Sequence, residues 1–279
     1  MTVRVVKADG RVEKFLPQKV RRTLRKAGVS SRTAMKIVAK IQETIYDGIT
    51  TKEILKRVKS LIPEEEPNAG LRYGLKGAIM RLGPTGFPFE TFVSEVFENY
   101  GYRTRLRSKL KGRCVQHEID VIAEREEGRV VRSMMECKFH NVSGGSIDLK
   151  DVLYTYARFL DMNDGSYAAK GNKFDKVWLV SNTKASPDAT KYANCRGMKL
   201  LCWRYPKGAG LEKMIEDKRL YPVTILPSVD RQTLDKLFLA NSLLVKDLLI
   251  DDLSNINKTG LKTKKLEKLT SEAKQLILQ

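Results

Sequence analysis

The sequence predicts a multi-domain protein that combines an α+β unit, an α/β unit and a C-terminal helical module. A chain of 279 residues exceeds the usual size of a single domain. Residues 2–15 alternate apolar and polar positions before a helical region, whereas residues 87–203 carry strand patterns separated by helical ones. The remaining residues have no convincing strand pattern. We therefore place the domains at residues 1–83, 84–222 and 223–279.

The charge of the chain favours a polyanionic partner. Its 52 Lys and Arg residues against 33 Asp and Glu residues give a net charge of +19, and such a surface attracts DNA by releasing counterions. No apolar run approaches the roughly 20 residues of a spanning helix, and no secretory pattern begins the chain. We expect DNA as a partner, no membrane partner and a cytoplasmic location, where the four cysteines stay reduced.

The first part predicts a β-hairpin followed by four helices. Gly10 lies between the two halves of the alternating segment and allows a tight turn. A capping box, Thr50-x-x-Glu53, begins the third helix, and Pro63 ends it. We expect helices at about residues 17–27, 31–45, 50–62 and 69–82.

This part resembles the ATP-cone, a nucleotide-binding regulatory domain, in VVKADGRVEKF (residues 5–15), Lys19 and DGITTKEI (residues 47–54). The resemblance implies a site for ATP or dATP. Two lysines and a helix N-terminus can hold a triphosphate, although without the resemblance the lysines would be ordinary surface residues. The implied nucleotide-binding residues are Val5, Lys7, Glu13, Lys19 and Thr51, with Arg11 and Arg81 as weaker candidates.

The second part begins with an amphipathic helix and a basic segment. Residues 89–100 place large apolar side chains at helical spacing, with Glu90 at the border of the apolar face and Glu95 pointing towards water. Residues 103–113 carry Arg or Lys at every second position and predict a basic loop after a short strand. Such a segment forms either a solvated edge or a contact with phosphate.

Residues 117–141 predict a hairpin that gathers three charged side chains. Valine and isoleucine favour strands on both sides of a turn at Gly128, so Asp120 on the first strand returns near Glu136 on the second. A strand places residues i and i+2 on one face, so Glu136 and Lys138 project together. An Asp, a Glu and a Lys that converge suit nuclease chemistry.

A helix, two strands and a further helix continue the α/β pattern. We expect strands at residues 176–182 and 198–203 and a helix at residues 187–196. The helix that follows Gly144-Gly145 should turn its larger apolar side chains inward. These are Leu149, Val152, Leu153, Tyr156 and Leu160.

The order of elements resembles the PD-(D/E)xK nucleases, and among them the Mrr-like restriction endonucleases. Three segments carry the resemblance: FETFVSEVFENYGY (residues 89–102), EIDVIA (residues 118–123) and ECKFHN (residues 136–141). They stand where that family has its helix acid, its metal-binding Asp and its E-x-K element. The resemblance implies hydrolysis of DNA phosphodiester bonds with Mg²⁺.

The same resemblance assigns roles to five residues. Asp120, Glu136 and the carbonyl of Cys137 would hold the metal, with Glu90 as a supporting acid. Lys138 would orient the attacking water and stabilise charge on the phosphate. Taken singly, Asp120, Glu136 and Lys138 would be surface charges of an ordinary hairpin.

Cysteine and histidine spacing offers a separate alternative. Cys114-x2-His117 and Cys137-x2-His140 have zinc-ligand types at short spacing. A continuing strand would put Cys137 and His140 on opposite faces, so ordinary core thiols are the competing interpretation.

The C-terminal part resembles a helix-hairpin-helix module around residues 257–277. A glycine-containing turn in such a module offers backbone N–H groups to a DNA phosphate, and nearby lysines add charge. A plain helical bundle for oligomerisation or capping is the alternative. The implied DNA-binding residues are Gly260, Lys262, Lys264 and Lys265.

Together these observations predict a nucleotide-regulated, Mg²⁺-dependent DNA endonuclease. We expect it to form a homo-oligomer, namely a dimer. An alternative is an ATP- or dATP-responsive DNA-binding regulator whose nuclease fold no longer cleaves. An accessory factor of ribonucleotide reductase would rest on the ATP-cone alone.

Overall fold

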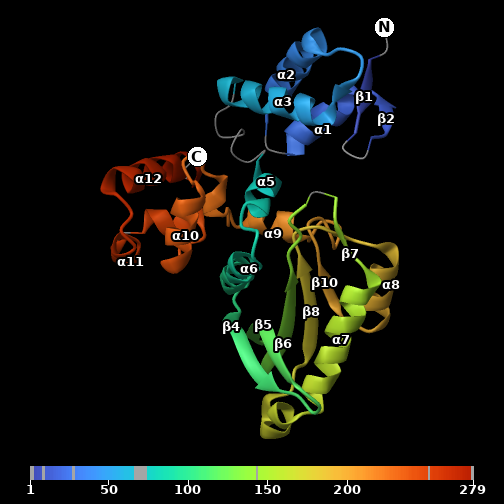
Figure 1. Ribbon diagram of the computed structural model, residues 1–279, viewed down its shortest axis with the longest axis vertical. Coiled ribbons are helices and arrows are strands. Elements are labelled where there is room, and N and C mark those ends of the chain that lie inside the picture. Colours follow the sequence, from blue (N-terminus) through green and yellow to red (C-terminus); the bar gives the residue numbers. More distant parts are fainter. Residues whose placement is uncertain are drawn as a thin grey trace. The chain divides into compact units, whose positions relative to one another are not determined.

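The computed structural model describes residues 3–7, 10–26, 29–65, 74–142, 144–250 and 252–277. Its chain divides into two compact units (Figure 1). Unit 1 comprises Met1–Leu75 together with Lys274–Gln279, and unit 2 comprises Lys76–Ala273. Strands and helices alternate as expected, and the C-terminal part is helical, which confirms the predicted fold class. The three-domain boundaries stay a prediction.

The hairpin of unit 1 forms where the alternating pattern predicts it. β1 (Arg4–Val6) pairs antiparallel with β2 (Val12–Lys14), and Val5 lies opposite Glu13. A short strand that the pattern does not predict, β3 (Ile49–Thr50), joins β1 in parallel. The chain therefore returns to the hairpin at the point where the third helix begins.

Side-chain caps begin two of the helices in unit 1. Ser30 accepts the N–H of Thr33 at 3.2 Å, and Glu53 donates its N–H to the Thr50 hydroxyl at 3.1 Å, so the predicted capping box is present. The third helix continues past Pro63, its predicted end, because a proline in the last turn removes only one helical hydrogen bond. These helices are α1 (Pro17–Lys26), α2 (Ser31–Thr44) and α3 (Thr51–Glu65).

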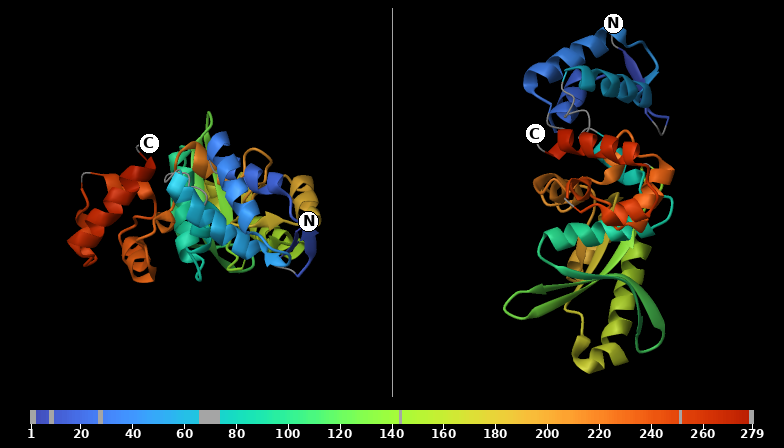
Figure 2. Two further views of the ribbon diagram at one scale, coloured as in Figure 1. Left: turned by 90° about the horizontal axis from the view of Figure 1, so that it is seen from above. Right: turned by 90° about the vertical axis from the view of Figure 1, so that its left-hand side faces the viewer.

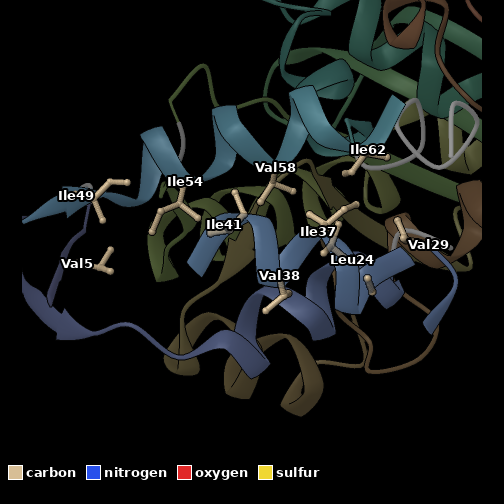
Figure 3. Packing of buried hydrophobic residues seen from close by; sticks show 11 residues of the cluster. Val5, Leu24, Val29, Ile37, Val38, Ile41, Ile49, Ile54, Val58 and Ile62 are labelled. Carbon is tan, nitrogen blue, oxygen red and sulfur yellow. The ribbon is translucent and has the colours of Figure 1, made fainter. Parts of the chain in front are cut away.

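Aliphatic side chains from the sheet and the three helices form the core of unit 1 (Figure 3). Val5 of β1 and Ile54 of α3 belong to the same cluster, which holds the hairpin close to the start of α3. The buried members are Val5, Leu24, Val29, Ala34, Ile37, Val38, Ile41, Ile49, Ile54, Val58 and Ile62.

Unit 2 is built on a mixed sheet of order β10-β8-β6-β5-β4. The strands β4, β5 and β6 pair antiparallel, whereas β6, β8 and β10 pair in parallel. Their bounds are β4 (Arg103–Lys111), β5 (Gln116–Glu126), β6 (Val130–Lys138), β8 (Lys176–Ser181) and β10 (Lys199–Leu201). Figures 1 and 2 show α6 (Phe87–Asn99) and α7 (Leu149–Asn163) against this sheet.

The apolar face of α6 is buried as predicted. Phe89 packs on Phe139 with ring centroids 5.4 Å apart, and Phe97 meets Trp178 edge-on at 5.3 Å. These contacts fix α6 on the sheet next to the β5–β6 hairpin.

Glu95 of α6 does not point towards water, and that prediction was wrong. It lines a cavity of about 390 Å³ together with Lys246 and Asp247, and burial raises its pKa to about 9. Helical spacing cannot reveal this contact because residues 241–247 come from a distant part of the sequence.

The predicted inward face of α7 was wrong in part. Val152 is buried as expected, but Leu149, Leu153 and Leu160 are 38%, 42% and 46% exposed. Thr155 and Arg158 take the buried positions instead, together with Val152 and Met162. Since two of these side chains are polar, an apolar pattern cannot identify the buried face.

The basic segment at residues 103–113 is mainly a strand and not a loop. β4 extends to Lys111 because its inner positions pair with β5 along nearly their whole length. β4 forms one edge of the sheet, with Arg105 and Lys109 exposed.

The remaining α-helices and β-strands of the described chain lie between and after these elements. Of the fourth predicted helix, α5 (Leu75–Met80) is present, and residues 69–73 lie outside the described residues. The others are β7 (Ser146–Ile147), β9 (Lys184–Ala185), α8 (Pro187–Cys195), α9 (Leu211–Asp217), α10 (Arg231–Leu239), α11 (Ser254–Lys258) and α12 (Thr263–Ile277).

Candidate functional site

The β5–β6 hairpin brings Asp120 and Glu136 together. In the antiparallel ladder Val121 lies opposite Met135. Asp120, one residue before Val121, therefore lies beside Glu136, one residue after Met135. The Asp120 carboxylate accepts the backbone N–H of Cys137 at 2.7 Å. Two of the predicted site residues are therefore neighbours on adjacent strands.

Three carboxyl groups share this partly buried site. Burial raises the pKa of Asp120, and burial followed by the negative charge of Asp120 raises the pKa of Glu136. The same two causes raise the pKa of Glu90 on α6 to about 7. Because each shift reflects lost hydration and like-charge repulsion, a bound cation would stabilise the ionised acids.

Helix α7 supplies partners to both charged residues of the E-x-K element. Arg158 donates to the carboxylate of Glu136, and the Lys138 ammonium lies 3.1 Å from the Asp151 carboxylate. Glu136 and Lys138 therefore share one face of β6, and α7 packs on that face. A second N–H group of Arg158 donates to the backbone carbonyl of Glu118.

Glu90 is connected to the edge strand. The Arg107 guanidinium donates to the Glu90 carboxylate and to the Thr91 hydroxyl, both at 3.3 Å. The side chain of Glu90 is only 11% exposed, whereas that of Arg107 is 32% exposed. Arg107 thus connects the edge strand β4 to the acid of α6.

The donor set suits a hard divalent cation. Asp120, Glu136 and the carbonyl of Cys137 offer the oxygen ligands that Mg²⁺ prefers, and the mutual repulsion of the two acids indicates charge that a cation would balance. Among the described residues, no group of three or more His, Cys, Asp or Glu side chains is arranged to hold a metal. The predicted metal site therefore has two side-chain ligands, the carboxylates of Asp120 and Glu136, and Arg158 already contacts that of Glu136.

Sequence reasoning missed the contacts that Arg107, Asp151 and Arg158 make with the acids and the lysine. Asp151 and Arg158 are seven residues apart, a spacing that places both on one face of a helix. That spacing was the available signal. Nothing in the sequence distinguishes Arg107 from the other basic residues of β4.

The histidines make separate contacts. His117 lies 2.8 Å from the Asp161 carboxylate, which also accepts the N–H of Cys114 at 2.8 Å and has its pKa lowered to about 2, first by that backbone bond. The backbone N–H of His140 donates to Asn182 at 2.9 Å. The His117 ring is therefore paired with a carboxylate, whereas His140 is held through its backbone and its buried Nε2 has no partner among the described residues.

All five main nucleotide-site candidates line one cavity of unit 1. Its volume is about 110 Å³. Glu13 lies 3.1 Å from the Lys19 ammonium and 3.4 Å from that of Lys7, and these lysines, Lys19 first, hold the pKa of Glu13 below its usual range. The candidates in the wall are Val5, Lys7, Glu13, Lys19 and Thr51.

The two weaker candidates lie elsewhere. Arg11 is exposed between β1 and β2 and is not among the described residues that line the cavity. Arg81 belongs to unit 2, where burial lowers its pKa.

The predicted DNA-binding turn of the C-terminal part is partly engaged within the protein. The N–H of Gly260 donates to the Asn257 carbonyl at 3.1 Å, and Lys265 pairs with Asp230 at 2.9 Å. Lys262 and Lys264 are exposed.

Three family models match the chain. They are the ATP cone domain at residues 3–69, the restriction endonuclease model at residues 84–204 and the AF1548-like, C-terminal model at residues 221–277. An uncharacterized protein of Archaeoglobus fulgidus is 39% identical over 185 residues, which are 66% of this chain and 99% of that relative. The chain belongs to the AF1548-like family.

A solved structure supports this membership. The crystal structure of the protein of unknown function AF1548 is 38% identical, with a TM-score of 0.60, and the match covers 69% of this chain and 98% of that chain. The MspJI restriction endonuclease in complex with a 27-mer oligonucleotide gives a TM-score of 0.38 at 15% identity, over 62% of this chain and 35% of that chain.

This AF1548-like protein thus contains an ATP cone and a restriction-endonuclease-like domain, which confirms both resemblances. The helix-hairpin-helix resemblance of residues 257–277 stays a prediction, because the matching model there is the AF1548-like, C-terminal one. Within the described ranges, no helix is long and apolar enough to cross a membrane.

Proposed function

We propose that this AF1548-like protein is a nucleotide-regulated, Mg²⁺-dependent DNA endonuclease. The observation that carries the proposal is the pair of Asp120 and Glu136, which are partly buried on adjacent strands with Lys138 on the same face as Glu136. The restriction-endonuclease-like domain and the net charge of +19 support DNA as the substrate.

The residues have distinct roles in this proposal. Asp120, Glu136 and the carbonyl of Cys137 would hold Mg²⁺, which when bound lowers the pKa of water and stabilises negative charge on the phosphate. Lys138, whose ammonium lies 3.1 Å from the Asp151 carboxylate, would orient the attacking water. Glu90 would add negative charge to the site and hold Arg107 in place.

The ATP cone would control this activity. In the proposed bound state, Lys7 and Lys19 leave Glu13 for the phosphates of ATP or dATP, close to Thr51 at the start of α3. Nucleotide binding would then change access to the cleavage site or the assembly of a homodimer.

A second candidate is a nucleotide-responsive DNA-binding regulator that does not cleave. The contact of Arg158 with Glu136 favours it, because an arginine occupies one oxygen of a predicted metal ligand.

Cleavage of DNA separates the two candidates. Wild type, Asp120→Ala and Lys138→Ala are incubated with linear, branched and damaged DNA, with Mg²⁺ or EDTA, and with or without ATP. We expect Mg²⁺-dependent cleavage by wild type and a loss on the order of 10³-fold in each variant. Asp188→Ala, which changes an exposed acid on α8, is the matched control. Binding by all proteins with cleavage by none would establish the regulator instead.

A further inference from the structure

Strand β4 reverses the direction of its side chains at Arg107. Thr104 and Leu110 are six residues apart and would share one face of a regular strand. Yet Thr104 hydrogen-bonds to Ser94 of α6 at 2.5 Å, whereas Leu110 packs in a cluster with Phe159 of α7. The strand therefore presents different faces to α6 and α7 on either side of Arg107.

The backbone at Arg107 accounts for this reversal. Its φ is 45°, in the left-handed region that residues other than glycine rarely adopt. In the ladder Leu106 lies opposite Val121 and Ser108 lies opposite Ile119, which leaves Arg107 opposite Asp120 without a pairing of its own. A disfavoured conformation in the middle of a strand, at the level of an active-site acid, is the kind of strain that functional sites hold.

The reversal sets Arg107 apart from the other basic residues of its strand. Its guanidinium reaches Glu90 and Thr91 through one nitrogen, Nη1, and lies 5.6 Å from the ring centroid of Phe87. Within the described part of the chain, Nε and Nη2 have no hydrogen-bond partner. Arg105, by comparison, donates to the Tyr167 hydroxyl on the α7 side.

We propose that Arg107 binds the phosphate of the DNA strand being cut, directly beside Asp120 and Glu90. Its unused donors suit the paired oxygens of a phosphodiester, a geometry that lysine cannot reproduce. Contact with Glu90 and Thr91 through Nη1 holds the side chain in place while the other nitrogens meet the phosphate. This inference rests on the proposed endonuclease function and adds a phosphate-binding residue to it.

Glycine provides a sharp test because it adopts a φ of 45° without steric cost. Arg107→Gly removes the guanidinium and relieves the backbone, whereas Arg107→Lys keeps the charge but not the planar fork. Arg129→Gly, in the β5–β6 turn, is the matched control because Arg129 is paired with Asp175 outside the acid cluster. Each protein is assayed by thermal unfolding, by DNA binding in EDTA over a range of salt concentrations, and by cleavage with Mg²⁺.

We expect Arg107→Gly to unfold at or above the wild-type temperature and to bind a fluorescein-labelled DNA duplex about tenfold more weakly. Its slope of log affinity against log salt should be smaller by about 1, as for the loss of one phosphate contact. Cleavage at saturating DNA should fall about 100-fold, with partial recovery in Arg107→Lys. The Arg129→Gly control should bind and cleave like wild type.

Two results would overturn the inference about Arg107 but leave the proposed function standing. If Arg107→Gly is unstable but binds and cleaves like wild type, Arg107 serves the fold. If it is stable with unchanged binding and cleavage, Arg107 has no role in the site. By contrast, a wild-type protein that neither binds nor cleaves DNA would remove the proposed function and the inference with it.

Discussion

Arg158 on α7 and Glu136 on β6 form a largely buried ion pair, with side chains 9% and 17% exposed. The arginine also donates to the backbone carbonyl of Glu118 on β5, so one side chain connects α7 to two strands. This contact ties the packing of a helix to the position of a proposed metal ligand. Stability and metal binding should therefore respond together to changes at Arg158.

Replacing Arg158 with methionine should destabilise the protein. The change leaves Glu136 buried without its cation, which costs about 3–5 kcal/mol in the free energy of unfolding. Adding Glu136→Gln removes the uncompensated charge and should restore part of the loss. Urea unfolding of wild type, Arg158→Met and the double variant measures both effects.

The same unfolding measurements, repeated with Mg²⁺, test whether Arg158 competes with the metal. Because both carboxylate oxygens of Glu136 are free in Arg158→Met, Mg²⁺ should raise its unfolding midpoint more than that of wild type. An equal response in the two proteins would mean that Arg158 does not compete with the metal.

Nucleotide binding to the ATP cone should depend on the two lysines that contact Glu13. Loss of a charge-assisted hydrogen bond costs about 1.5–3 kcal/mol, so Lys7→Ala and Lys19→Ala should each weaken ATP and dATP binding by roughly 10- to 100-fold. Calorimetry measures the affinity. Lys56→Ala, an exposed lysine on α3, is the control and should bind normally. Unchanged affinity in both lysine variants would place the triphosphate elsewhere.

Stability should fall with rising pH because of Glu95. Burial, then the charges of Asp247 and Glu98, raise its pKa to about 9, and Lys246 opposes them. The folded state therefore binds this proton more tightly than the unfolded chain, in which the pKa of a Glu has its ordinary value of 4.5. Its unfavourable contribution begins near pH 4.5 and grows until about pH 9.

Glu95→Gln should remove this dependence. One carboxylate oxygen of Glu95 is buried without a partner among the described residues, a defect that costs about 1–3 kcal/mol. The variant should exceed wild type in unfolding free energy at pH 8 and match it near pH 4. Glu98→Gln, at an exposed position, should have a smaller effect. Parallel pH profiles for wild type and Glu95→Gln would contradict the assignment.

The sequence predicted the elements that carry the acids better than the contacts around them. Strand patterns flanking Gly128 place Asp120 beside Glu136, because pairing across a tight turn is a local property of the chain. The contact between Arg158 and Glu136 depends on how α7 packs, and an apolar pattern cannot identify a helix that buries an arginine. A positive φ at Arg107 is likewise invisible, since arginine has no preference for it.

The same packing leaves an apolar stripe on the outer face of α7. Leu149, Leu153 and Leu160 are exposed at spacings of four and seven residues, so they lie along one side of the helix. An antiparallel pairing with α7 of a second copy would place Leu153 against the partner copy of Leu160. It would also bring the exposed Lys150 near the exposed Asp164 at both ends. This self-complementarity fits a two-fold symmetric dimer.

We therefore expect glutamate at both Leu153 and Leu160 to abolish the proposed dimer. Size-exclusion chromatography with light scattering should give wild type at twice the chain mass of 31.7 kDa and the double variant at the chain mass. Leu239→Glu, at the end of α10, is the control because Leu239 is also exposed but lies outside the stripe. A monomeric wild type, or a double variant that still dimerises, would contradict pairing through α7. Four like charges brought together in the variant interface oppose association strongly, so a true α7 interface could not tolerate them.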